Sequence, residues 1–130
     1  MCSRRRFTVA AALLALGSFV IAGETEPILV LVNYRVAEQD PDRIVETVTN
    51  RLEGPLQRLP GVMRMHSMTG NGTVLVEIQF DGDATQQDVA AVTRRLDEVE
   101  LDAVTVLSRS VRLGTPSRYW ALSQSEEAGS

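Results

Sequence analysis

Residues 62–80 read VMRMHSMTGNGTVLVEIQF, which is two strand-like runs joined by a glycine-rich turn. In the second run, apolar residues alternate with polar ones, as in a strand with one buried face. The turn, Thr69-Gly70-Asn71-Gly72, is short enough to join residues 62–68 and 73–80 directly as neighbours. The middle of the chain is therefore predicted to be a β-hairpin.

A helix is predicted immediately before this hairpin. Asp40 can cap its free backbone N–H groups, and Pro41 suits the first helical position. Apolar residues then recur at spacings of three and four, which makes one face of the helix apolar: Val45, Val48, Leu52, Leu56 and Leu59. Gly54-Pro55 lies within this pattern, so we expect a kink there, or a break followed by a short second turn.

Strands are predicted at both ends, with a second helix after the hairpin. Residues 28–36 (ILVLVNYRV) are apolar and β-branched without strict alternation, as in a central strand. The second helix begins at Asp83 or Thr85 and buries Val89, Val92, Leu96 and Val99. Residues 104–113 supply the last strand.

The resulting order of elements is βαββαβ. With right-handed crossovers, this order is typical of one fold class. We expect an α+β, ferredoxin-like sandwich, in which a four-stranded antiparallel sheet carries both helices on one face. The predicted domain spans residues 23–114, after an N-terminal apolar segment (1–22) and before a flexible tail (115–130).

The N-terminal segment has the pattern of an export signal. Arg4, Arg5 and Arg6 precede an uncharged run of 16 residues, 7–22, which is shorter than the roughly 20 residues of a membrane-spanning helix. Val20 and Ala22 fit a cleavage site, so the mature chain would start at Gly23. The alternative is an uncleaved anchor in the cytoplasmic membrane. The Ser3-Arg4-Arg5-Arg6-Phe7 stretch fits both the twin-arginine and the general secretory route.

The net charge excludes some classes of partner, and the cysteine content excludes a disulfide within the chain. Removing the three arginines with the signal lowers the formal net charge from -4 to -7, and such an acidic domain is a poor partner for nucleic acid or anionic lipid. Cys2 is the only cysteine, so no disulfide can form within the chain. We expect a periplasmic or secreted protein that meets the membrane only through residues 1–22, if these are retained.

No catalytic constellation is visible in the sequence. His66 is the only histidine, and no serine or aspartate is spaced around it as in an activated nucleophile. The acidic pairs Asp40/Asp42 and Asp81/Asp83 are interpreted as helix caps and turn formers. We therefore expect a protein that is not an enzyme and that uses no cofactor.

A metal site is the sharpest alternative. Thioether and imidazole ligands suit Cu(I), and the hairpin's first strand carries four of them: Met63, Met65, His66 and Met68. On a regular strand Met63 and Met65 face one way while His66 and Met68 face the other, so one ion could meet all four only at a bulge. Methionine as core filler is the competing interpretation.

The tail also carries one apolar cluster. Tyr119, Trp120 and Leu122 stand in a stretch that is otherwise polar from Ser123 onward. Two interpretations remain open: the cluster packs back on the open sheet face or edge, or it is a hook for a partner.

Several of these residues resemble the first porter subdomain of the resistance-nodulation-division (RND) efflux transporters. The family pattern V-E-x-x-V-T-x-P-L-E is matched in part, and one residue shorter, by Val45-Glu46-Thr47-Val48-Thr49 and Leu52-Glu53. The pattern G-V-x-x-x-x-S corresponds to residues 61–67, followed here by Gly72 and a strand ending in Phe80. The resemblance covers residues 28–113 and implies the same βαββαβ order. There are departures: the Pro-Gly after the first strand is absent at Tyr34-Arg35-Val36, and the helix proline is replaced by Arg51, with Pro55 nearby.

This resemblance implies an accessory role and not pumping. The chain lacks positions for the intramembrane carboxylates that the family uses for proton coupling. We expect a binding or interaction module whose partners are RND transporter components or further copies of itself. The alternatives are a periplasmic small-ligand or Cu(I)-binding protein, and a truncated permease fragment.

Overall fold

The computed structural model of the chain describes residues 26–117 and Trp120. The predicted segments 1–22 and, apart from residues 115–117 and 120, the tail lie outside the described residues. The elements follow one another as β1 (Leu29–Val36), α2 (Pro41–Ile44), η2 (Val45–Thr49), α3 (Asn50–Gln57), β2 (Val62–Thr69), β3 (Thr73–Phe80), α4 (Gln86–Asp97) and β4 (Val106–Gly114). Since α2, η2 and α3 are contiguous, the βαββαβ order is confirmed.

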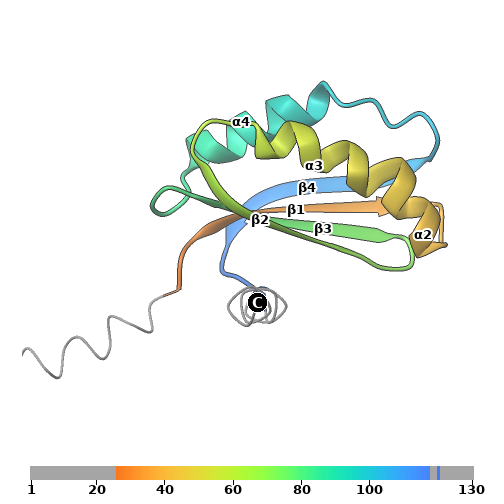
Figure 1. The fold of residues 1–130 in the computed structure, drawn as a ribbon, viewed down its shortest axis with the longest axis horizontal. Coiled ribbons are helices and arrows are strands. Elements are labelled where there is room, and N and C mark those ends of the chain that lie inside the picture. The colour runs from red at the N-terminus through yellow and green to blue at the C-terminus, as the bar shows by residue number, and fades with distance from the viewer. Residues whose placement is uncertain (1–25, 118–119, 121–130) are drawn as a thin grey trace, which may run out of the picture.

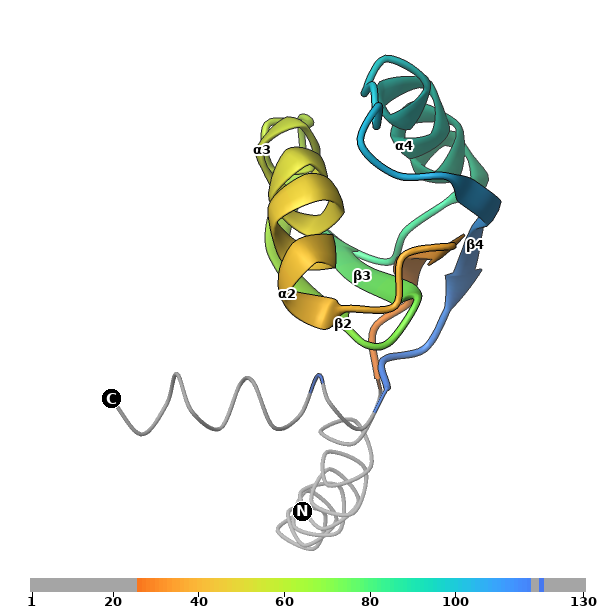
Figure 2. The same ribbon diagram turned by 90° about the vertical axis from the view of Figure 1, so that its right-hand side faces the viewer.

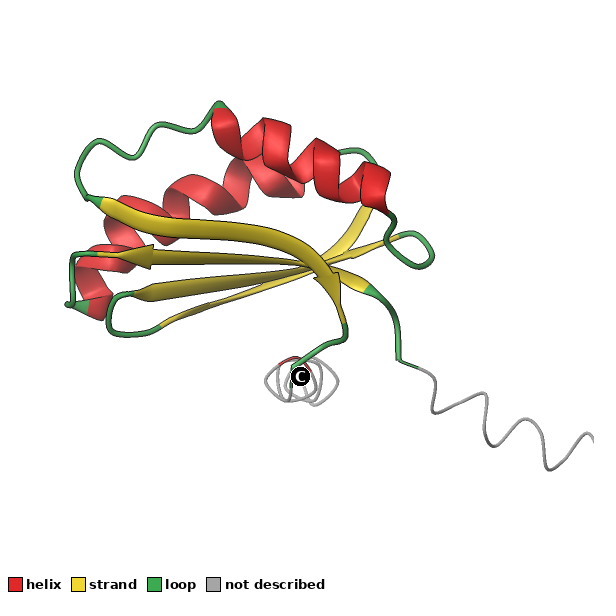
Figure 3. Cartoon of the chain, turned by 180° about the vertical axis from the view of Figure 1, so that it is seen from behind, coloured by secondary structure: helices red, strands yellow, loops and turns green. Residues whose placement is uncertain are grey.

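The four strands form one sheet in the order β2-β3-β1-β4, and every neighbouring pair is antiparallel. Both helical segments cover the same face of this sheet, as Figures 1 and 2 show. Seen from behind, the strands lie together beneath the helices (Figure 3). The predicted α+β sandwich with helices on one face is therefore confirmed.

Alternation along the inner strands explains where the core lies. In β1, Val30, Val32, Tyr34 and Val36 are all buried, and in β3 the same is true of Val74, Val76, Ile78 and Phe80. Register places Val30 opposite Ile78 and Val32 opposite Val76, so both rows point to the same face. The helices complete this core with the apolar residues Ile44, Val48, Leu52, Leu56, Leu59, Val92 and Leu96.

The first helix starts as predicted and continues through Gly54-Pro55 to Gln57. The Asp40 carboxylate accepts a hydrogen bond of 3.1 Å from the Asp42 amide, and Pro41 occupies the first turn. A break at Gly54-Pro55 is not present, because α3 includes Pro55 and ends at Gln57. Proline has no N–H to donate, so the carbonyl four residues before it, that of Arg51, loses its usual helical hydrogen bond. The irregular turn lies earlier, in the π-helical η2.

Three further contacts fix the ends of the helices. Thr85 caps α4 in a capping box with Asp88, while Asp83 accepts a 3.1 Å hydrogen bond from the backbone N–H of Ile28. The Arg95 guanidinium donates to the Pro55 carbonyl at 2.8 Å and so joins α4 to the end of α3.

Among residues 26–117, no helix has the length and apolar character needed to cross a membrane.

The sheet face opposite the helices is partly covered as well. Leu29 and Leu31 of β1 point away from the helices and form a second buried cluster with Trp120. The predicted packing of Trp120 back onto the open sheet face is thus confirmed, whereas Tyr119 and Leu122 lie outside the described residues. Strand β1 is central and buried on both faces over this part, as its continuous apolar run predicts.

Candidate functional site

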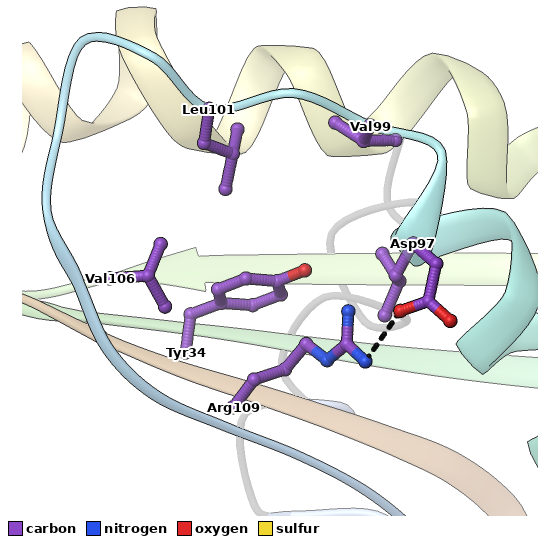
Figure 4. Close-up of a pocket in the computed structure, with 7 residues that line it drawn as sticks. Tyr34, Asp97, Val99, Leu101, Val106 and Arg109 are labelled. Carbon is purple, nitrogen blue, oxygen red and sulfur yellow. Dashed lines mark hydrogen bonds and ion pairs between the residues drawn. The ribbon is translucent and has the colours of Figure 1, made fainter.

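A pocket of about 350 Å³ lies on the helix side of the sheet, where α4 ends and the chain returns to β4. Its walls come from β1, from the end of α4, from the connection 98–105 and from the start of β4 (Figure 4). Four apolar and three polar side chains line it: Leu96, Val99, Leu101 and Val106, with Tyr34, Asp97 and Arg109. Such a mixture of apolar walls and a few convergent polar groups is typical of ligand sites.

The polar end of the pocket is assembled by strand register. Tyr34 lies on the helix face of β1, and Arg109 is its direct partner on β4. Asp97 is the last residue of α4, and its carboxylate Oδ1 accepts a hydrogen bond of 2.8 Å from Arg109 Nη2. Figure 4 shows the Tyr34 ring beside Arg109, with its hydroxyl turned toward the ion pair. Three elements distant in the chain thus bring a phenol, a guanidinium and a carboxylate together.

Burial and charge set the ionisation of these groups. Tyr34 is only 3% exposed, and burial raises its pKa, while the neighbouring Arg109 guanidinium partly opposes that rise. The hydrogen bond to Asp97 raises the pKa of Arg109 above its ordinary value. At neutral pH the pocket therefore presents a protonated phenol and a charged guanidinium already engaged by a carboxylate.

The margin of the pocket is acidic. The segment from Asp97 to Asp102 carries four carboxylates in six residues, the other two being Glu98 and Glu100. Arg95 forms an ion pair with Glu98 at 3.8 Å, and Arg109 pairs with Asp97. Glu100 and Asp102 are exposed and add negative charge at this end of the domain. Arg94 also lies in the last turn of α4, so this end of the domain carries four carboxylates against three arginines and has a small excess of negative charge.

The residues predicted as metal ligands are divided between the two faces of β2. Met65 is opposite Ile78 and packs against the core, whereas His66 and Met68 are opposite Glu77 and Leu75 on the other face. Met63 lies at a register shift between Val62 and Arg64 and is 67% exposed. The structure thus brings His66 and Met68 to a common face and separates Met65 from them. Within the described part of the chain, no group of three or more His, Cys, Asp or Glu side chains could hold a metal ion. Cu(I) binding by the four residues stays a prediction.

Sequence reasoning did not find the pocket residues. The core-facing residues of β1 are aliphatic except for Tyr34. A tyrosine hydroxyl at a core position usually needs a hydrogen-bond partner, and this could have indicated a polar group nearby. Arg109 could have been placed on the same face by counting back in steps of two from Leu113 and Val111. The position of Asp97 beside them depends on how α4 packs across the sheet, which no local pattern reveals.

Comparison with known proteins adds a fold-level relationship. No family model matches the chain, and no curated protein matches it in sequence. Among solved structures, a heavy metal efflux pump is similar with a TM-score of 0.55 at 18% sequence identity, over 85% of this chain. The chain spans 12% of the length of that pump. This likeness supports a distant RND-like fold, in keeping with the porter resemblance.

Proposed function

We propose that this chain is a non-enzymatic binding and interaction module with a porter-type fold that acts as an accessory to an efflux system. The observation that carries the proposal is the likeness to a heavy metal efflux pump over most of the domain. The residues of the RND porter pattern point the same way, since they occur along both the first helix and the hairpin. The export-type segment 1–22 would bring the domain to the periplasmic side of the cytoplasmic membrane.

An outer sheet edge offers the means of docking. Strand β4 ends the sheet order, and within residues 26–117 no strand pairs with its outer side. Two apolar residues at its start are exposed, Val106 at 39% and Leu107 at 56%. An edge with free backbone groups and exposed apolar side chains is suited to strand addition by a transporter component or a second copy.

The docking proposal is tested by purifying the tagged full-length chain from envelope extracts. We expect a transporter component to be recovered with it, and Leu107→Asp to reduce that recovery. Met63→Asp is the matched control, because Met63 is also a large exposed apolar residue but lies on β2 at the opposite edge. Repeated recovery without any transporter component contradicts the efflux link. Loss of recovery in Met63→Asp alone assigns docking to β2 and contradicts the use of β4.

A second candidate function is favoured by the pocket. A cavity of about 350 Å³ with a buried phenol and an ion pair at one end is suited to receive a small molecule between the sheet and α4. Ligand-dependent increases in melting temperature, absent from a variant with a blocked pocket such as Leu101→Arg, would support this role.

A further inference from the structure

The pocket between β1, β4 and the end of α4 carries more information than the presence of a cavity, because its size, shape and charge restrict the ligand. A volume of about 350 Å³ is near the lower limit of ligand pockets. At roughly 30 Å³ for each water-sized group, it holds on the order of ten non-hydrogen atoms. The ligand is therefore a small molecule and not a folded partner or a long chain.

The walls define the body of that molecule. Val99 and Leu101 face the pocket from the connection after α4, and Val106 faces it from the start of β4 (Figure 4). The Tyr34 ring closes the side formed by the sheet. Tyr34 is only 3% exposed and acts as a floor, so the accessible apolar surface comes from Val99, Leu101 and Val106. Aliphatic side chains on these walls favour a ligand whose body is apolar, such as one ring or a short branched chain.

The polar end defines the head group. Asp97 and Arg109 are joined through one carboxylate oxygen, Oδ1, and the Asp97 side chain is 58% exposed. Its carboxylate can therefore accept a second donor from a molecule in the pocket. Arg109 is already engaged by Asp97 and lies 30% exposed beneath the pocket. A donor head group thus gains an acceptor, while an acceptor head group has to compete with Asp97.

The sign of the ligand's charge follows from the charged residues around the mouth of the pocket. Asp97, Glu98, Glu100 and Asp102 place four carboxylates at this end, against the three arginines Arg94, Arg95 and Arg109. A negative field at the mouth attracts cations and repels carboxylates. We infer that this pocket binds a small apolar molecule that carries one protonated amine. The ammonium would donate to Asp97, and the apolar body would lie against Tyr34, Val99, Leu101 and Val106.

This inference rests on the second candidate function, ligand binding in the pocket, and names the chemical class of that ligand. A charge-reversed pair of probes tests it on the full-length chain: phenethylamine, and 3-phenylpropionate, which has the same apolar body with a carboxylate in place of the amine. We expect phenethylamine to bind with a Kd of roughly 1 mM, as befits a molecule of this size. It should shift the backbone amide NMR signals of Val99, Leu101 and Val106, with phenylpropionate at least about tenfold weaker.

Two variants identify the head-group contact. Asp97→Asn should weaken phenethylamine binding by about tenfold or more, as expected for loss of a charged hydrogen-bond partner. Asp81→Asn makes the same chemical change at an exposed position in the turn after β3, outside the pocket lining, and should leave the affinity unchanged. Melting curves of both variants establish that they fold.

The outcomes separate the two levels of the proposal. Equal or tighter binding of phenylpropionate overturns the amine assignment while leaving ligand binding intact, and so does unchanged phenethylamine affinity in a folded Asp97→Asn. No saturable shift by either probe at about ten times the expected Kd overturns ligand binding in the pocket altogether. None of these results bears on docking through β4, which is tested separately by recovery from envelope extracts.

Discussion

Both carboxylate oxygens of Glu77 accept hydrogen bonds from a single residue, Ser117, which lies 40 positions further along the chain. The Ser117 backbone N–H donates to Oε2 at 2.8 Å, and its hydroxyl donates to Oε1 at 3.1 Å. Glu77 is 1% exposed, although it lies on the sheet face opposite the helices. This contact, together with Trp120 on Leu29 and Leu31, holds the segment after β4 against the sheet.

Glu77→Gln should loosen this segment, because it replaces two charge-assisted hydrogen bonds from Ser117 with weaker bonds to a neutral amide. The expected loss is about 1–3 kcal/mol in the free energy of unfolding, measured with urea. Trp120 is the only tryptophan, so its fluorescence should also shift to longer wavelength as it becomes exposed. Glu46→Gln, on the exposed side of η2, is the control. An unchanged emission spectrum in Glu77→Gln would contradict the role assigned to the Ser117 contact.

Gly114 should not tolerate a methyl group. A Cβ added there would lie 2.5 Å from Leu31 Cδ1, so the packing of Leu31 beneath Trp120 would have to shift. We expect Gly114→Ala to destabilise the domain by about 1–3 kcal/mol. Gly54→Ala is the matched control: its Cβ meets only the far end of the Arg58 side chain at 3.4 Å, and alanine favours a helix. That variant should gain about 0.5–1 kcal/mol. Equal effects in thermal unfolding would argue against the close packing at Gly114.

The fold was predictable because local signals agreed along the chain. Alternation in residues 73–80, the three-and-four spacing of the first helix and the cap at Asp40 each indicated the element that forms there. The choice between a kink and a break at Gly54-Pro55 was open in the sequence, and the structure decides against the break, because α3 continues through Pro55 to Gln57. The choice of Thr85 over Asp83 as a cap was also open, because Asp83 bonds instead to Ile28 across 55 residues.

The candidate site was less predictable than the fold. The residues that carry the porter resemblance proved to make structural contacts between helix and strand: Ser67 donates a hydrogen bond to Glu53, and the hydroxyls of Thr49 and Thr69 are 2.8 Å apart. The pocket residues Tyr34, Asp97 and Arg109 belong to no motif. They meet because register pairs Tyr34 with Arg109 and because α4 ends above them, which are relationships of tertiary structure.

Thr49→Val tests the helix-to-strand contact. Thr49 is 5% exposed, and valine keeps its shape but removes the hydroxyl that meets Thr69. We expect a loss of about 1 kcal/mol in urea unfolding, from the missing hydrogen bond. Thr47→Val, on the same helix but only half-buried and bonded to the Arg43 carbonyl, is the control and should change stability less. A neutral result in Thr49→Val would show that the two hydroxyls contribute nothing to stability.

The buried phenol of Tyr34 predicts a loss of stability at alkaline pH. Burial raises its pKa in the folded chain, so the folded state retains the proton longer than the unfolded state does. The stabilising contribution is complete below the ordinary tyrosine pKa of about 10 and is lost as the pH rises through the folded pKa. Unfolding measured across this range should be less pH-dependent in Tyr34→Phe than in the parent chain. Tyr119→Phe removes the only other tyrosine and serves as the control. A steeper alkaline dependence in Tyr34→Phe would contradict the raised pKa.

A Cu(I) titration decides whether the methionines of β2 bind metal. Because Met65 packs into the core while His66 and Met68 lie on the opposite face, the strand cannot offer all of these ligands to one ion without rearranging. We therefore expect the chain not to compete with a chromogenic Cu(I) chelator at micromolar metal. The titration is made in a Cys2→Ser background, which removes the only thiol. Stoichiometric withdrawal of Cu(I) that is lost in both His66→Asn and Met65→Leu would show that β2 does rearrange around the ion. Loss in His66→Asn alone, with Met65→Leu unaffected, would instead indicate a smaller site on the face that His66 shares with Met68.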